Sequence, residues 1–173
     1  IVFSALGITL AGTMDEYWTI FADEAGLPRA ALGVFVAVGY IVQAIGGVVA
    51  YRFEGLTERW FYASVALSGS LLIVAAWSMH PLSLVLIIVF GLIHKVVEVV
   101  FEARLQRLIP SDTRATVASV RGFASEVVGL PMFLAMGIIV GDGPYQPGFF
   151  VFGALTAVVG VGYGLTSMKP SRM

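Results

Sequence analysis

The chain has 173 residues, of which 58% are hydrophobic and 12% are charged, and its formal net charge is −1. A soluble domain carries about 25% charged residues, so this composition excludes an ordinary water-soluble core. The near-neutral charge and the lack of a basic stripe give no case for a nucleic-acid partner. The absence of cysteine excludes disulfides and thiolate metal sites.

Six apolar runs are each long enough to cross about 30 Å of hydrocarbon as a helix, which takes about 20 residues. The runs are too long for strands, and an isolated strand in a membrane would leave backbone groups unpaired. We therefore predict an all-α membrane protein, a single bundle of six transmembrane helices over residues 1–173. The expected spans are Val2–Phe21, Ala30–Tyr51, Trp60–Met79, Pro81–Ala103, Ala115–Val140 and Gly148–Met168.

Basic residues divide unevenly between the loops. If alternate loops share a side, seven basic residues fall on one side and only Arg29 on the other. The positive-inside rule then makes the richer side cytoplasmic, with the C-terminus inside. Because Ile1 already lies in an apolar run with no charged segment before it, we expect no signal peptide and a truncated N-terminus. The seven residues are Arg52, Arg59, Arg104, Arg107, Arg114, Lys169 and Arg172.

The first two spans carry few polar groups. Asp15 and Glu16 lie about one turn from the outer loop, where both a solvated pair and a functional pair remain open. Tyr17 and Trp18 beside them fit an interfacial aromatic belt. In the second span the polar side chain is Gln43.

The third and sixth spans carry no ionisable residue between their ends, so they can face lipid. Trp60 and Trp77, at the two ends of the third span, are expected to be belt residues. The glycines in Gly46-Gly47 and in Gly160-Val161-Gly162 lie inside apolar helices, and no P-loop Lys-Ser/Thr follows them. We expect these glycines to serve helix packing.

The fourth span carries four ionisable residues, and their spacing places them on one helical stripe. His94 or Lys95, Glu98 and Glu102 recur every three to four residues. One interpretation is an internal ion pair between neighbours that only neutralises buried charge. The other is a stripe that lines a water-filled path, because four such groups exceed what one neutralising pair requires.

The fifth span carries Arg121 in its inner third and Glu126 near mid-depth. Gly122 and Gly129 lie one turn before and after Glu126, and small residues allow another helix or a ligand to approach closely. A partly desolvated carboxyl there could load and unload a proton. The alternative is a carboxylate tied to Arg121 or Lys95. Pro131 is expected to kink this span.

Catalysis finds no support in the sequence. The two histidines, His80 and His94, lie on different elements, so a clustered histidine metal site is not expected. We expect no enzyme activity, no cofactor and no metal.

Two loops resemble the major facilitator superfamily. Residues 46–53, Gly-Gly-Val-Val-Ala-Tyr-Arg-Phe, resemble the G-x-x-x-D-R-x-G-R-R loop that closes the second helix of each six-helix half in that family. Arg52 matches the motif arginine, while Tyr51 stands at the acid and Glu54 at the second glycine. Residues 107–119, Arg-Leu-Ile-Pro-Ser-Asp-Thr-Arg-Ala-Thr-Val-Ala-Ser, look like the I-P-x-x-x-R-A-x-x-x-S start of the eleventh helix in many bacterial members.

The resemblance covers the whole chain as helices seven to twelve, a six-helix half-bundle whose N-terminal partner half is missing. It implies that the first, second, fourth and fifth spans line a central cavity while the third and sixth face lipid. The placement of the charges agrees with that division. It also implies a bacterial inner-membrane location, and a cytoplasmic gate that comprises Gly46, Gly47, Arg52 and Glu54, together with Glu58.

Taken together, these features predict secondary active transport of a small molecule by alternating access between two halves. The expected activity is proton-coupled efflux of a lipophilic drug or metabolite, as in an antiporter, because the sequence has no Asn and few Gln for a sugar. Import of a small organic acid and a non-transporting receptor or assembly subunit remain alternatives. The expected partners are the bilayer, the substrate, H⁺ and the missing half or a second copy. The candidate substrate and proton-coupling residues are Glu126, Glu98, His94, Lys95, Arg121, Gln43, Asp15 and Glu16.

Overall fold

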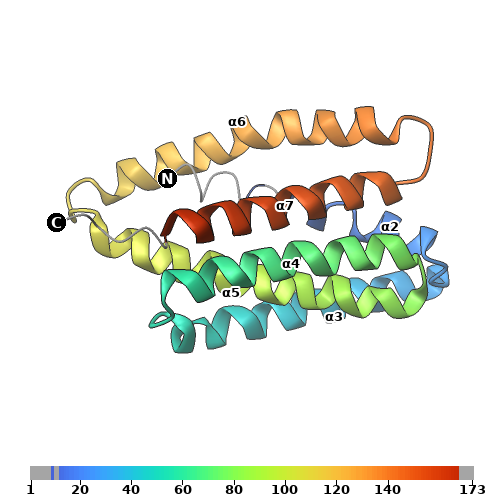
Figure 1. Ribbon diagram of the computed structural model, residues 1–173, viewed down its shortest axis with the longest axis horizontal. Coiled ribbons are helices and arrows are strands. Elements are labelled where there is room, and N and C mark those ends of the chain that lie inside the picture. The colour runs from blue at the N-terminus through green and yellow to red at the C-terminus, as the bar shows by residue number, and fades with distance from the viewer. Residues whose placement is uncertain (1–8, 10–11, 168–173) are drawn as a thin grey trace.

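The computed structural model describes residue 9 and residues 12–167, and that part of the chain is helical without a strand (Figure 1). Five of its helices are long and apolar enough to cross a membrane. The all-helical prediction is therefore confirmed, as are helices at the second to sixth predicted spans. The helices are α2 (Trp18–Glu24), α3 (Arg29–Val49), η1 (Ala50–Phe53), α4 (Glu58–Ser78), η2 (Pro81–Ser83), α5 (Leu84–Leu108), α6 (Arg114–Val140) and α7 (Gln146–Ser167).

The first predicted span is not confirmed by the described residues. Residues 1–8, 10 and 11 lie outside the described residues, and residues 12–15 are helical. A turn at Glu16 and Tyr17 then interrupts the helix before α2 begins. The prediction of one continuous helix up to Phe21 is therefore wrong. Glu16 at this break is exposed and lines a cavity, and non-helical backbone in a membrane protein is tolerated where it lines a cavity.

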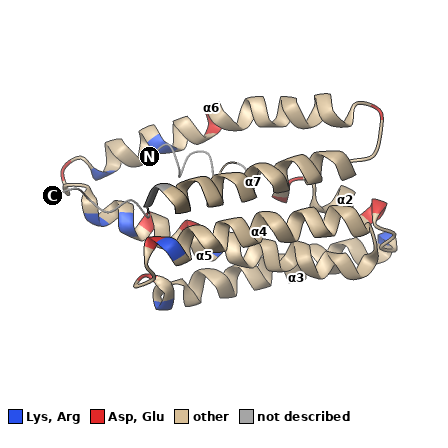
Figure 2. Cartoon of the chain, viewed as in Figure 1, with Lys and Arg blue, Asp and Glu red and all other residues tan. Residues whose placement is uncertain are grey.

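Successive long helices run antiparallel, and their connections collect at two ends (Figure 1). The α3–α4 and α5–α6 connections lie at one end, where Figure 2 shows most of the basic segments. At the other end, Gly26 and Gly141 adopt positive φ angles of 87° and 53° after α2 and α6. Such angles suit glycine because it has no Cβ. The alternation of loops assumed from the sequence is thus present among the described helices.

Helix α5 forms the centre of the bundle. It packs against α3 on one side and α4 on the other, while α4 packs along the length of α7. Helix α6 lies at the edge of this group and contacts α7 (Figure 1). Only Gly129, Met136 and Val140 of α6 are buried, so most of this helix presents its side chains outward.

Glycines bring α4 and α7 into backbone contact. A Cβ added at Gly69 would lie 2.4 Å from the backbone nitrogen of Ala157, and one at Gly160 would lie 2.4 Å from that of Ala66. Small residues at these positions allow the two helices to approach closely, which is a common way for membrane helices to associate. The predicted packing role of the glycines in Gly160-Val161-Gly162 is confirmed for Gly160, whereas an added Cβ at Gly162 meets no described atom within 4 Å.

The prediction that Trp18 belongs to an interfacial aromatic belt is wrong. Its side chain is only 3% exposed, and its indole lies between α3 and α5. An added Cβ at Gly39 would come within 2.8 Å of the ring, and one at Gly91 within 2.5 Å. Two facing glycines therefore create the slot, a feature that the sequence neighbourhood of Trp18 does not reveal. Trp60 and Trp77 are exposed, as expected for belt residues.

Candidate functional site

The ionisable stripe of α5 begins with an ion pair. Lys95 Nζ lies 2.8 Å from Glu98 Oε2, three residues further along the helix. The two side chains are 36% and 32% exposed, so this pair sits on an open face of the bundle rather than in its core. The neighbour pairing expected from the spacing is therefore present, and it leaves the stripe accessible.

A second ion pair joins α5 to α6. Glu102 pairs with Arg121, and Gln106 Nε2 donates to the other carboxylate oxygen of Glu102 at 2.9 Å. Arg121 Nε is buried and makes no hydrogen bond with a described residue. The pair holds the otherwise loosely packed α6 to the centre of the bundle. It also means that Arg121 and Lys95 each have a glutamate partner other than Glu126.

Asp15 extends this polar region toward α3. Its carboxylate is close enough to Lys95 and Glu98 to interact with their charges, and it lies beside Gln43. Gln43 Nε2 is buried but makes no hydrogen bond of ordinary geometry with a described residue, so its contact with Asp15 is looser than a normal hydrogen bond. His94 is half-buried and stacks on Phe90, with ring centroids 6.2 Å apart.

A cavity of about 250 Å³ opens between residues 9 and 12–16 on one side and α6 on the other. Thr9 Oγ1 donates to the Ser125 carbonyl oxygen at 3.4 Å, and Thr13 Oγ1 donates to the Thr9 carbonyl oxygen at 2.8 Å. Glu16 and Glu126 both line this cavity, and neither forms an ion pair within the described part of the chain. The walls also include Gly12, Gly129 and Phe133.

Glu126 therefore stands apart from the two ion pairs. Of its flanking glycines, Gly129 faces Thr9, whose methyl carbon lies 3.4 Å from the position of an added Cβ, while Gly122 meets open space. Helix α6 stays helical through Pro131. The site thus combines hydroxyl groups, an aromatic wall and two carboxylates whose charge no described basic residue neutralises.

The residues of the predicted cytoplasmic gate, at the α3–α4 connection, do not form a compact charge cluster. Arg52 Nε donates to Tyr51 Oη at 3.1 Å, and Glu54 pairs with Arg107 of α5. Gly46 is buried against Leu92 of α5, whereas Gly47 has no atom near the position of an added Cβ. The loop is thus tied to the end of α5 by Glu54 rather than by Arg52.

The structure gathers most of the candidate residues into two neighbouring groups. One lies along α5 and comprises Asp15, Gln43, Lys95 and Glu98, and the other lines the cavity at α6 and comprises Glu16 and Glu126. Residues 9 and 12–16 lie near both α5 and α6, and the two acids of the broken first helix meet them: Asp15 faces α5, and Glu16 lines the cavity at α6. Sequence reasoning missed the hydroxyl groups of Thr9 and Thr13, whose spacing of four residues places them on one helical face. It also missed the Trp18 indole nitrogen, which is buried without a hydrogen-bond partner among the described residues.

Comparison with known proteins found no relative of this chain. No family model matches the chain, and no curated protein or solved structure matches it either. The resemblance to the major facilitator superfamily accordingly rests on residues 46–53 and 107–119 alone, and the assignment of a family remains a proposal.

Proposed function

We propose that this chain is one half of a secondary active transporter of the major facilitator type. Its supporting observation is a single open polar face. Lys95, Glu98, Glu102 and Arg121 lie on helices of membrane-spanning length, and each side chain keeps between 26% and 36% exposure.

An ionisable side chain at the bilayer centre costs at least about 2.5–3.5 kcal/mol, so such a face is expected to meet water or another polypeptide rather than lipid. Secondary transporters use this arrangement, with the substrate bound near mid-membrane between two halves that rock around it. The partner would be a further six-helix half or a second copy of this chain. The broken helix at Glu16 and Tyr17 also fits, because interrupted helices line binding sites in several transporter folds.

The charges favour a lipophilic substrate over an organic acid. Both basic residues within the spans, Lys95 and Arg121, are already paired with glutamates. The cavity between α6 and residues 9 and 12–16 instead presents, beside Phe133, two carboxylates that pair with no basic residue in the described part of the chain. We therefore retain proton-coupled efflux as the proposed activity, with Glu126 as the proton-carrying group.

Flux measurements in proteoliposomes test this proposal. Vesicles carrying the chain paired with a second copy, or with a co-reconstituted partner half, are loaded with the lipophilic dye rhodamine 6G, and an imposed pH gradient should drive its movement. Glu126→Gln should abolish this movement, because an amide cannot exchange a proton. Asp142→Asn removes an acid from an exposed loop and should leave it unchanged.

Two results would contradict different parts of the proposal. Wild-type flux in Glu126→Gln would remove Glu126 from the coupling mechanism. Vesicles in which the chain is folded and paired, yet moves no dye under any gradient, would favour a receptor or assembly subunit.

A further inference from the structure

Helix α5 has two chemically different faces. Positions 94, 95, 98 and 102 carry ionisable groups on one face, and positions 92, 93, 96, 97 and 100 carry Leu, Ile and Val on the other. At about 100° per residue, the centres of these two sets lie on opposite sides of the helix. The apolar side therefore looks away from the polar face that we assign to the transport pathway.

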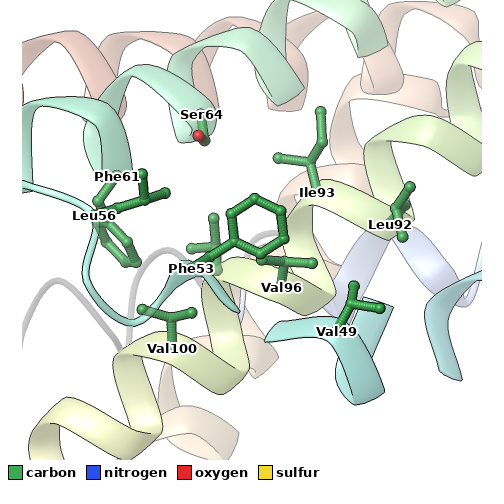
Figure 3. Close-up of a pocket in the computed structure, with 10 residues that line it drawn as sticks. Val49, Phe53, Leu56, Phe61, Ser64, Leu92, Ile93, Val96 and Val100 are labelled. Atoms are coloured by element: carbon green, nitrogen blue, oxygen red, sulfur yellow. The ribbon is translucent and has the colours of Figure 1, made fainter. Parts of the chain in front are cut away.

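That apolar side forms the floor of a groove. A cavity of about 250 Å³ lies between the end of α3, the α3–α4 connection, α4 and α5 (Figure 3). Figure 3 shows Phe53 and Leu56 of the connection, Phe61 of α4 and Val96 of α5 around it.

Among the residues that the structure describes, none offers the groove a free hydrogen-bonding side chain. Its polar lining residue is Ser64, whose hydroxyl already donates to the Trp60 carbonyl oxygen at 2.9 Å. A polar ligand would lose its hydrogen bonds to water here without replacement, which costs free energy. The lining therefore suits a hydrocarbon chain.

The mouth of the groove is basic. Arg104 lies one turn beyond the lining residue Val100, and its guanidinium carbon is 5.3 Å from the centre of the Phe61 ring. It donates to the backbone carbonyl oxygens of Glu54 and Leu56 but pairs with no carboxylate among the described residues.

Glu54 is already engaged by Arg107. Arg52, next to the lining residue Phe53, likewise has no carboxylate partner in the described chain. Around the groove mouth, residues 52–59 and 103–108 carry four arginines and two acids, namely Arg52, Arg59, Arg104, Arg107, Glu54 and Glu58.

We propose that this groove binds an anionic phospholipid from the leaflet at the basic end of the bundle, with an acyl chain along α5 and the phosphate near Arg104 and Arg52. Hydrocarbon complements the lining, and a phosphate complements the excess of arginine, which favours phosphate through its planar set of donors. A lipid held here would tie the α3–α4 connection to α5 at the end where a transporter must open and close. The site is separate from the polar face, so it stands whether or not the chain transports.

Native mass spectrometry of the detergent-purified chain tests the groove. With phosphatidylglycerol and phosphatidylcholine added in equal amounts, phosphatidylglycerol should be retained preferentially. Ser64→Phe fills the groove and should reduce that retention by about tenfold or more. Ser70→Phe is the matched control, because Ser70 is an exposed serine of α4 that also donates to the carbonyl oxygen four residues before it. Ser70→Phe should retain the lipid as the wild type does.

A second pair of variants tests the headgroup. Arg104→Gln should remove the preference for phosphatidylglycerol over phosphatidylcholine, whereas Arg114→Gln, on the first turn of α6, should keep it. Circular dichroism establishes that each variant is folded, and Val49→Phe replaces Ser64→Phe if the latter is not. Equal retention of the two lipids by the wild type, or unchanged retention in a folded groove-filling variant, would overturn the proposal. Both results would leave the flux experiment unaffected.

Discussion

At the scale of single residues, two glycines determine where Trp18 lies. The indole occupies a slot between Gly39 and Gly91, and an added Cβ at Gly91 would lie 2.5 Å from its ring. Gly91→Ala should therefore displace the indole and destabilise the fold by about 1–3 kcal/mol, as overpacking typically does. From its place beside Tyr17, Trp18 was expected at the membrane interface. The slot depends on which helices meet, and no local sequence pattern encodes that.

Fluorescence can follow this displacement. In a Trp60→Phe/Trp77→Phe background, the remaining Trp18 should emit at short wavelength and resist quenching by acrylamide, since it is 3% exposed. Gly91→Ala should shift the emission to longer wavelength and increase quenching. Gly47→Ala, where an added Cβ meets no atom within 4 Å, should change neither. Unchanged emission in Gly91→Ala would mean that the indole lies elsewhere.

At the scale of helices, the α4–α7 contact depends on glycine. Gly160→Ala would place a Cβ 2.4 Å from the backbone nitrogen of Ala66, and backbone cannot move aside as a flexible side chain can. We expect a lower melting temperature in detergent. Gly162→Ala, two residues further along α7 and facing open space, should be neutral or stabilising by up to about 1 kcal/mol, because alanine favours helix. Equal melting temperatures for the two variants would contradict close α4–α7 packing.

The ion pair between Glu102 and Arg121 is the clearest link between α5 and α6. Arg121→Gln alone leaves the buried Oε2 atom of Glu102 without its cationic partner, and an uncompensated charge on a buried atom is costlier than a lost pair. The double variant Glu102→Gln/Arg121→Gln should therefore be more stable than Arg121→Gln alone. Thermal unfolding of the single and double variants measures this coupling. Additive effects would show that the two side chains do not interact.

The sequence predicted helices better than the contacts between them. Long apolar runs identify five membrane-length helices, because a bilayer requires about 20 apolar residues whatever their partners are. Spacing along one helix also predicted that Lys95 and Glu98 are neighbours. The partner of Glu102 lies on another helix, and no glycine or proline marks the break at Glu16 and Tyr17. Both depend on tertiary packing, which the periodicity of the sequence does not encode.

For the whole molecule, the polar face is predicted to be wet while the outer face of α4 is dry. Ser125 lines the cavity beside Glu126, and Leu67 is 54% exposed on α4. Each residue lies in the middle part of a long helix. The native chain has no cysteine, so Ser125→Cys and Leu67→Cys each introduce a unique thiol. In membrane vesicles a charged maleimide should label Cys at position 125 and not at position 67, because the thiolate that reacts does not form in hydrocarbon.

The two positions together distinguish a cavity from a lipid-covered helix. Labelling at 125 alone would mean that water reaches mid-membrane depth along α6, as a transport pathway requires. Labelling at neither position, combined with a disulfide-linked dimer of Ser125→Cys, would mean that a second copy covers the polar face. Labelling at 67 but not at 125 would reverse the assignment of the two faces, and the proposed pathway would then be wrong. Since this experiment needs no substrate, it decides whether the open polar face is a pathway before any transported compound is known.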